Sequence, residues 1–171
     1  MIDHEEGSNG VMEMAAAPLL AEESVPPQGA KAKFAGDLGA GERTGRIRAI
    51  VADDTPSFLH LCSAYLEVHT PAVEVVGKAS NGALALFLAE ELHPELILLD
   101  VNMPIMNGLE AASRLREKFS GLKILMMSGD DNPDLREACF DNGADAFAAK
   151  GNLRQELPAR LQQLFPSLQI P

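Results

Sequence analysis

The chain has 171 residues, enough for one domain of ordinary size with a tail and too few for two full hydrophobic cores. Hydrophobic residues make up 46% and aromatic residues 5%, with no Trp, which favours small aliphatic packing in a helix-and-sheet protein over an aromatic-rich β-sandwich. The net charge of −11, without any basic run, argues against direct nucleic-acid binding, because a phosphate-binding surface needs clustered Lys and Arg.

The first 45 residues are rich in Ala, Gly, Pro and Glu and show no sustained periodicity. Such a composition buries too little apolar surface to offset chain entropy, so residues 1–45 are predicted to form a disordered N-terminal extension. Glu13 interrupts their apolar patch, which argues against both a secretory signal and membrane insertion. We therefore expect a cytoplasmic protein, in which the widely separated Cys62 and Cys139 are buried free thiols.

From Arg46 onward, strand-like and helix-like patterns alternate along the chain. Short apolar, β-branched runs predict five strands, at Ile47–Ala52, Val73–Lys78, Leu96–Leu99, Leu122–Met127 and Ala144–Ala149. Apolar residues at helical spacing predict five helices, at Pro56–Val68, Asn81–Leu92, Gly108–Phe119, Asn132–Asp141 and Leu153–Phe165. Thr55 is expected to cap the first helix, and Asp130 with Asp131 to form a solvated cap of the fourth.

This alternation determines the expected fold class. Strand–helix units with short loops indicate an α/β protein whose parallel sheet has helices on both faces. Right-handed crossovers and one reversal of strand order predict a doubly wound five-stranded sheet in the order 2-1-3-4-5. The domain is predicted to span residues 46–166, followed by a short tail at 167–171, which leaves no room for an output domain.

Acidic side chains follow two strands that are neighbours in this order. Asp53 and Asp54 end the first strand and Asp100 ends the third, so three carboxylates should converge in the crevice at the carboxyl end of the sheet. Their mutual repulsion would raise pKa values and lower stability unless a cation is bound. A hard divalent cation with oxygen ligands, Mg²⁺ or in its place Mn²⁺, is therefore the expected cofactor.

A hydroxyl and an ammonium group are predicted to reach the same crevice. Ser128 follows the fourth strand, and Lys150 follows the fifth. Carboxylates, a metal ion, a hydroxyl donor and a fixed Lys are the parts of a phosphoryl-transfer site, because cations neutralise the phosphoryl oxygens while a carboxylate oxygen attacks in line.

Four stretches in register resemble the response-regulator receiver family of two-component signalling: Val51–Asp54, Leu98–Gly108, Met127–Gly129 and Gly143–Lys150. The resemblance implies a flavodoxin-like receiver fold. It also implies that Asp100 is the phosphoacceptor, that Asp54 binds the metal directly and that Asp53 acts on it through water. The backbone carbonyl of Asn102 would be the third protein ligand.

The same resemblance assigns the remaining site positions. Ser128 matches the residue that binds the phosphoryl group and turns toward it, and Lys150 matches the lysine that pairs with that group. Phe147 matches the aromatic that changes rotamer on activation, while Gly108 belongs to the loop that shapes the site. One departure is Gly151, which stands where many receivers have a proline.

The resemblance implies a phosphorylation-controlled signalling module. Its phosphoryl donor would be a sensor histidine kinase or a histidine phosphotransfer protein, and its output would be an interaction with a downstream protein. It would not be an enzyme beyond catalysing its own phosphorylation and dephosphorylation. One alternative is a phosphorylation-independent interaction module on a receiver scaffold. Another is a phosphohydrolase of the haloacid dehalogenase type, which is disfavoured because Asn102 stands where such enzymes carry a general acid.

Overall fold

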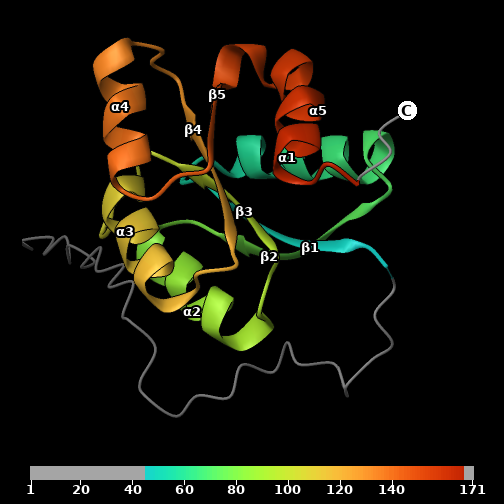
Figure 1. Ribbon diagram of the computed structural model, residues 1–171, viewed down its shortest axis with the longest axis horizontal. Coiled ribbons are helices and arrows are strands. Elements are labelled where there is room, and N and C mark those ends of the chain that lie inside the picture. Colours follow the sequence, from blue (N-terminus) through green and yellow to red (C-terminus); the bar gives the residue numbers. More distant parts are fainter. Residues whose placement is uncertain (1–44, 168–171) are drawn as a thin grey trace, which may run out of the picture. The chain divides into compact units, whose positions relative to one another are not determined.

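A computed structural model describes residues 45–167 as strands alternating with helices (Figure 1). The strands are β1 (Ile47–Ala52), β2 (Val73–Ala79), β3 (Leu96–Asp100), β4 (Lys123–Ser128) and β5 (Ala146–Ala149). The helices are α1 (Pro56–His69), α2 (Gly82–Leu92), α3 (Gly108–Lys118), α4 (Pro133–Asp141) and α5 (Leu153–Leu164), with a short 3₁₀ helix at Lys150–Asn152. The predictions for residues 1–44 and 168–171 lie outside the described residues.

The sheet has the predicted topology. All four strand pairings are parallel, and the order is β2-β1-β3-β4-β5. The register pairs Ala52 with Leu99 and Ser128 with Ala149, so the strands end at nearly the same level. The residues that follow β1, β3, β4 and β5 therefore meet at one edge of the sheet, beside the point where the strand order reverses.

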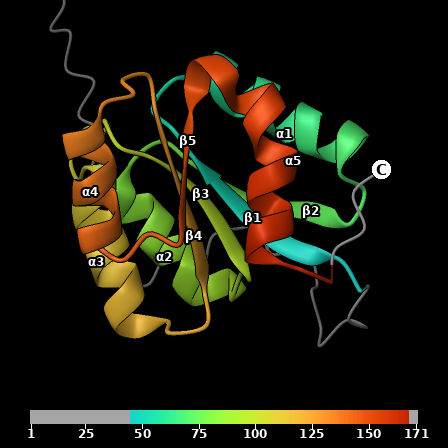
Figure 2. The ribbon, with the colours of Figure 1, turned by 45° about the horizontal axis from the view of Figure 1, so that its top comes forward.

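Helices cover both faces of the sheet, as the doubly wound fold requires. Figure 2 shows α1 and α5 together on one face, with α3 and α4 on the other. Two buried clusters match this division: one contains residues of α2, α3 and α4, and the other contains residues of α1 and α5. Every residue of β3 is buried, because this central strand has helices above and below it.

Asparagine side chains cap three of the helices. Asn81, Asn107 and Asn132 each accept a hydrogen bond from the backbone N–H three residues later, at 2.8, 2.9 and 2.8 Å. The prediction of an Asp130–Asp131 cap for α4 is therefore wrong, since Asn132 occupies that position. Thr55 occupies the cap position of α1 but makes no cap bond with its side chain.

Both cysteines are buried free thiols, as predicted. Burial raises the pKa of the Cys62 thiol to about 12 and that of Cys139 to about 11, so neither thiol ionises near neutral pH. Within residues 45–167, no helix combines the length and the apolar character needed to cross a membrane.

Candidate functional site

Three carboxylates meet at the carboxyl end of β1 and β3. Asp53 follows β1, Asp54 comes next in the chain, and Asp100 is the last residue of β3. One carboxylate oxygen from each can be chosen so that all lie within 4.8 Å of one another. Asp53 and Asp100 are buried, with 0% and 2% of their surface exposed, whereas Asp54 is exposed. The site is thus an acidic crevice with two buried carboxylates, Asp53 and Asp100, and one exposed carboxylate, Asp54, at its opening.

The loop between β3 and α3 is held close to Asp100 by a glycine. Gly108 begins α3, is buried, and donates its N–H to the carbonyl of Val101 at 2.8 Å. A Cβ at this position would lie only 1.9 Å from the backbone carbonyl oxygen of Asp100. Only glycine permits this approach, so Gly108 helps to set the position of the Asp100 backbone.

Lys150 joins the two buried carboxylates. Its Nζ lies 2.7 Å from Oδ2 of Asp53 and 2.9 Å from Oδ1 of Asp100. The ring of Phe58, on α1, lies 4.7 Å from the same nitrogen and forms a cation–π contact with it. The side chain of Lys150 is 19% exposed, so the ammonium group is largely shielded and fixed between a carboxylate pair and an aromatic face.

Burial and charge change the proton affinities of these groups. Burial raises the pKa of Asp100 above its usual range, Asp53 raises it further, and Lys150 and the backbone of Asn102 oppose the change. For Lys150, burial lowers the pKa, but the carboxylates of Asp53 and Asp100 outweigh that effect and the pKa is raised overall. The ammonium group is therefore charged at neutral pH, while burial disfavours the ionised form of the Asp100 carboxyl group.

The residues of the crevice fit a divalent cation. The three carboxylates carry more negative charge than Lys150 neutralises when all are ionised. Oδ2 of Asp53 is buried and forms an ion pair with Lys150 at 2.7 Å, and residues 45–167 supply no further hydrogen-bond donor to it. Hard oxygen ligands of this kind suit Mg²⁺, which retains several waters when few protein ligands are present. Asn102 lies two residues beyond Asp100 and is exposed; the ligand role of its carbonyl stays a prediction.

Ser128 ends β4 between β3 and β5. Its residue surface is 0% exposed, and its Oγ accepts a hydrogen bond from the backbone N–H of Asp130 at 3.0 Å. The hydroxyl proton remains available for donation to another acceptor. Within residues 45–167, no atom apart from those of its chain neighbours lies within 4 Å of the place where a Cβ of Gly129 would stand, so a side chain at this position would meet open space. The roles predicted for Ser128 in phosphoryl binding and switching stay predictions.

Phe147 lies in β5, three residues before Lys150, and pairs with Met126 of β4. It is only 2% exposed and belongs to the cluster formed with α2, α3 and α4. The guanidinium of Arg136, on α4, lies over its ring at 4.7 Å from the centroid. Whether Phe147 changes rotamer stays a prediction.

Sequence reasoning missed two side chains next to the predicted site residues. Phe58 contacts Lys150, and Arg136 contacts Phe147. The sequence marks Phe58 only as an apolar position of a helix and Arg136 only as one of several helix arginines. A cavity of about 280 Å³ beside Lys150 was also not predicted; it is lined by Phe58, Leu61, Cys62, Tyr65 and residues 150–155.

Known proteins share this fold and these motifs. The sequence profile of the response regulator receiver domain family matches residues 49–162. The nitrate/nitrite response regulator protein NarL of Escherichia coli K12 is 42% identical over 93 residues, which cover 54% of this chain and 43% of that protein. The chain therefore spans less than half the length of this relative.

Two solved structures resemble the domain in both sequence and fold. The signal receiver domain of the putative response regulator NarL from Mycobacterium tuberculosis is 32% identical, with a TM-score of 0.65 over 70% of this chain and 96% of that chain. The response regulator domain of Thermotoga maritima CheB is 27% identical, with a TM-score of 0.64 over 74% of this chain and 98% of that chain.

Proposed function

The chain belongs to the response regulator receiver domain family of two-component signalling, and from this premise we propose that it accepts a phosphoryl group on Asp100. The observation that carries the proposal is the contact of Lys150 with both Asp53 and Asp100, at 2.7 and 2.9 Å, inside an acidic crevice. A structural ion pair would need only one carboxylate. Two buried carboxylates on one lysine, with a third at the mouth, form a site that binds a cation and an anionic phosphoryl group together.

In the proposed reaction an oxygen of the Asp100 carboxylate attacks phosphorus. A new bond forms between that oxygen and phosphorus, the bond from phosphorus to the donor atom breaks, and its electron pair leaves with the donor. Lys150 and the hydroxyl of Ser128 would stabilise the charge on the phosphoryl oxygens. Asp53, Asp54, Asp100 and the Asn102 carbonyl would hold Mg²⁺ or Mn²⁺, which when bound supplies positive charge to the transferring group.

The proposed phosphoryl donor is a sensor histidine kinase or a histidine phosphotransfer protein. The exposed side of α1 supports docking of a protein next to the crevice, because Leu61 and Val68 on this helix are 54% and 72% exposed. Leu61 also lines the cavity beside Lys150, so the apolar surface continues to the site. The output would be contact with a downstream protein, and the chain would catalyse only its own phosphorylation and dephosphorylation.

One observation favours a second candidate, a phosphorylation-independent interaction module. The guanidinium of Arg136, on α4, lies over the Phe147 ring, and its ion pair is with Asp131 and not with a carboxylate of the acidic crevice. A switch residue held in this way can keep the face around α4 and β5 constant, whether or not Asp100 carries a phosphoryl group.

Acetyl phosphate with Mg²⁺ distinguishes the two candidates. The proposed receiver should gain one phosphoryl group as a hydroxylamine-labile acyl phosphate, seen by mass spectrometry of the intact chain. Asp100→Asn should abolish this gain, and Asp141→Asn, which changes an exposed carboxylate on α4, should not. Unchanged modification of the Asp100 variant would place the acceptor elsewhere. No modification of the wild type by acetyl phosphate or phosphorylated donor proteins would favour the interaction module.

A further inference from the structure

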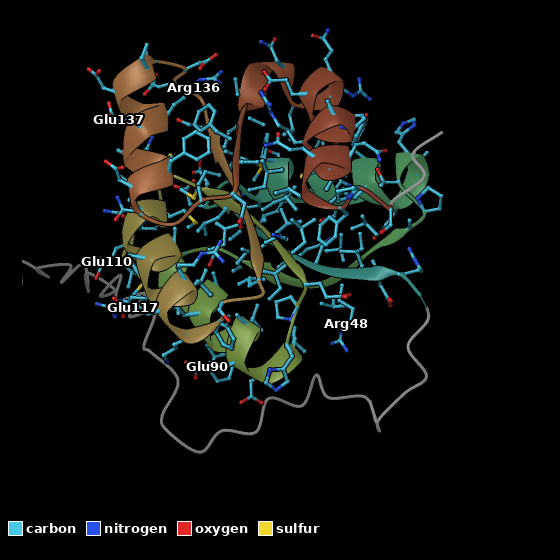
Figure 3. All side chains as sticks on the ribbon, in the orientation of Figure 1. Arg48, Glu90, Glu110, Glu117, Arg136 and Glu137 are labelled. Atoms are coloured by element: carbon cyan, nitrogen blue, oxygen red, sulfur yellow. The ribbon has the colours of Figure 1, made fainter. Side chains whose placement is uncertain are left out.

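Arg136, the one arginine of α4, lies against the ring of Phe147 in β5. Figure 3 shows Arg136 on the side of α4 that faces β5, whereas the neighbouring Glu137 points away on the outer side. The guanidinium carbon lies 4.7 Å from the centroid of the Phe147 ring. Cys139, three residues further along the same helix face, is fully buried in the cluster that contains Phe147. Arg136 therefore covers the outer side of this cluster.

A second contact fixes the guanidinium over the ring. Its Nε donates to Oδ1 of Asp131 at 2.6 Å, and Asp131 lies in the loop that leads from β4 into α4. The side chain of Arg136 is 35% exposed and that of Asp131 is 40% exposed, so as an ion pair alone this contact would contribute little to stability. Its geometry matters more than its energy, because the carboxylate holds one edge of a planar cation whose face lies on Phe147.

We propose that Arg136 is a positioning residue that holds the Phe147 ring in its buried rotamer, with Asp131 holding Arg136 in turn. Within residues 45–167, the ion pairs and side-chain hydrogen bonds of Arg136 and Asp131 do not include Asp53, Asp54 or Asp100, so this restraint needs no phosphoryl group on Asp100. Its consequence for signalling rests on the proposed function. Phosphorylation can change the position of Phe147 only to the extent that it favours one rotamer over the other, and a restraint that already favours the buried rotamer limits that change.

The size of the effect follows from the contact. A cation over an aromatic ring at a partly exposed site changes a two-state ratio by roughly two- to fivefold. Arg136→Ala should therefore raise the ratio of outward to buried Phe147 rings by that factor. Asp131→Asn should give a smaller change in the same direction, since the guanidinium stays but loses its anchor. Arg136→Lys should restore part of the wild-type value, because an ammonium keeps the charge but not the planar face.

Fluorine NMR of fluorophenylalanine-labelled full-length chain measures this ratio. The chain contains seven Phe residues, and the signal that disappears in Phe147→Leu identifies the ring. A soluble paramagnetic agent then reports how much of that signal reaches solvent. Arg114→Ala is the matched control, because Arg114 is a helix arginine of α3 with its own ion pair to Glu110, and the cation–π contact on Phe147 among the described residues comes from Arg136.

The expected result is that Phe147 is more exposed to solvent in the Arg136 and Asp131 variants than in wild type. In the Arg114 control its exposure should equal that of wild type. Equal exposure in wild type and Arg136→Ala, or an equal rise in the control, overturns the proposal. If Arg136→Ala does not fold, the same assay on Asp131→Asn and Arg136→Lys tests the proposal, because both should expose Phe147 more than wild type does. These measurements use no phosphoryl group, so failure of Asp100 phosphorylation leaves them interpretable.

Beryllofluoride with Mg²⁺ adds the signalling readout. If the restraint limits the switch, the change of the Phe147 signal on adding the mimic should be larger in Arg136→Ala than in wild type. Mimic binding without any such difference overturns the regulatory consequence. An absence of mimic binding in both proteins counts against the proposed function instead.

Discussion

Gly108→Ala reverses the sign of the effect that helix propensity alone predicts. Alanine in place of glycine at an unrestrained helix position stabilises a protein by roughly 0.5–1 kcal/mol. Here the new Cβ would stand 1.9 Å from the carbonyl oxygen of Asp100, 2.8 Å from its carbonyl carbon and 2.9 Å from Cα of Val101. A carbon and an oxygen in contact need about 3.3 Å, so the two backbone segments must separate by roughly 1.4 Å. None of the three atoms belongs to a side chain that can rotate away.

We expect Gly108→Ala to lower the free energy of unfolding by about 2–3 kcal/mol, toward the upper end of the cost of overpacking. The displacement also moves the phosphoacceptor, and a misplacement of about 1 Å can slow a reaction by about 10²-fold. Urea unfolding followed by circular dichroism measures the first effect, and the rate of labelling by acetyl phosphate measures the second.

Gly121→Ala is the matched control for this substitution. No atom of the described residues lies within 4 Å of the place where a Cβ of Gly121 would stand, so the change should stay within about 0.5 kcal/mol. If Gly108→Ala is as stable as wild type and is phosphorylated at the same rate, Gly108 does not hold Asp100 in position.

Four further changes test the site. Asp54→Asn should weaken Mg²⁺ binding at least about tenfold, since even supporting residues of metal sites cost that much; equal titration curves would exclude Asp54 as a ligand. Lys150→Ala should slow phosphorylation by about 10²-fold or more while Mg²⁺ still binds, and an unchanged rate would leave Lys150 structural. Burial raises the pKa of Asp100 in the folded protein. The contribution of this carboxyl group to stability is therefore fully present at low pH and is lost as the pH rises through the raised pKa. In EDTA, the stability of Asp100→Asn relative to wild type should therefore rise as the pH is raised above the usual pKa range of a carboxyl group, and a difference that does not depend on pH would show that the pKa of Asp100 is not raised. Ser128→Ala should bind beryllofluoride, but the change in the amide NMR signal of Phe147 on binding should be smaller than in wild type. Changes of wild-type size would show that Ser128 does not couple the site to Phe147.

The sheet could be predicted because each of its signals is local. Short apolar runs separated by helical periodicity identify strands and crossovers, and the handedness of crossovers leaves few strand orders. The boundary of β5 was predicted less well: it begins at Ala146, not Ala144. Asp145 instead accepts the N–H of Ile124 and pairs with Arg116, whose guanidinium also binds the carbonyl of Gly143. That network joins residues up to 29 positions apart, so no local pattern could reveal it.

The order of residues along the chain determined which positions lie at the carboxyl edge of the sheet. Asp53, Asp100, Ser128 and Lys150 each end or follow a strand, and parallel strands bring such positions to one edge. Only the tertiary structure decided how these groups meet: that Lys150 pairs with Asp53 as well as Asp100, with Phe58 beside it. It also placed Arg136 over Phe147, from a separate helix. The physical reason is that strand pattern sets the backbone position of a residue, whereas the direction and partners of its side chain depend on packing between helices that are distant in sequence.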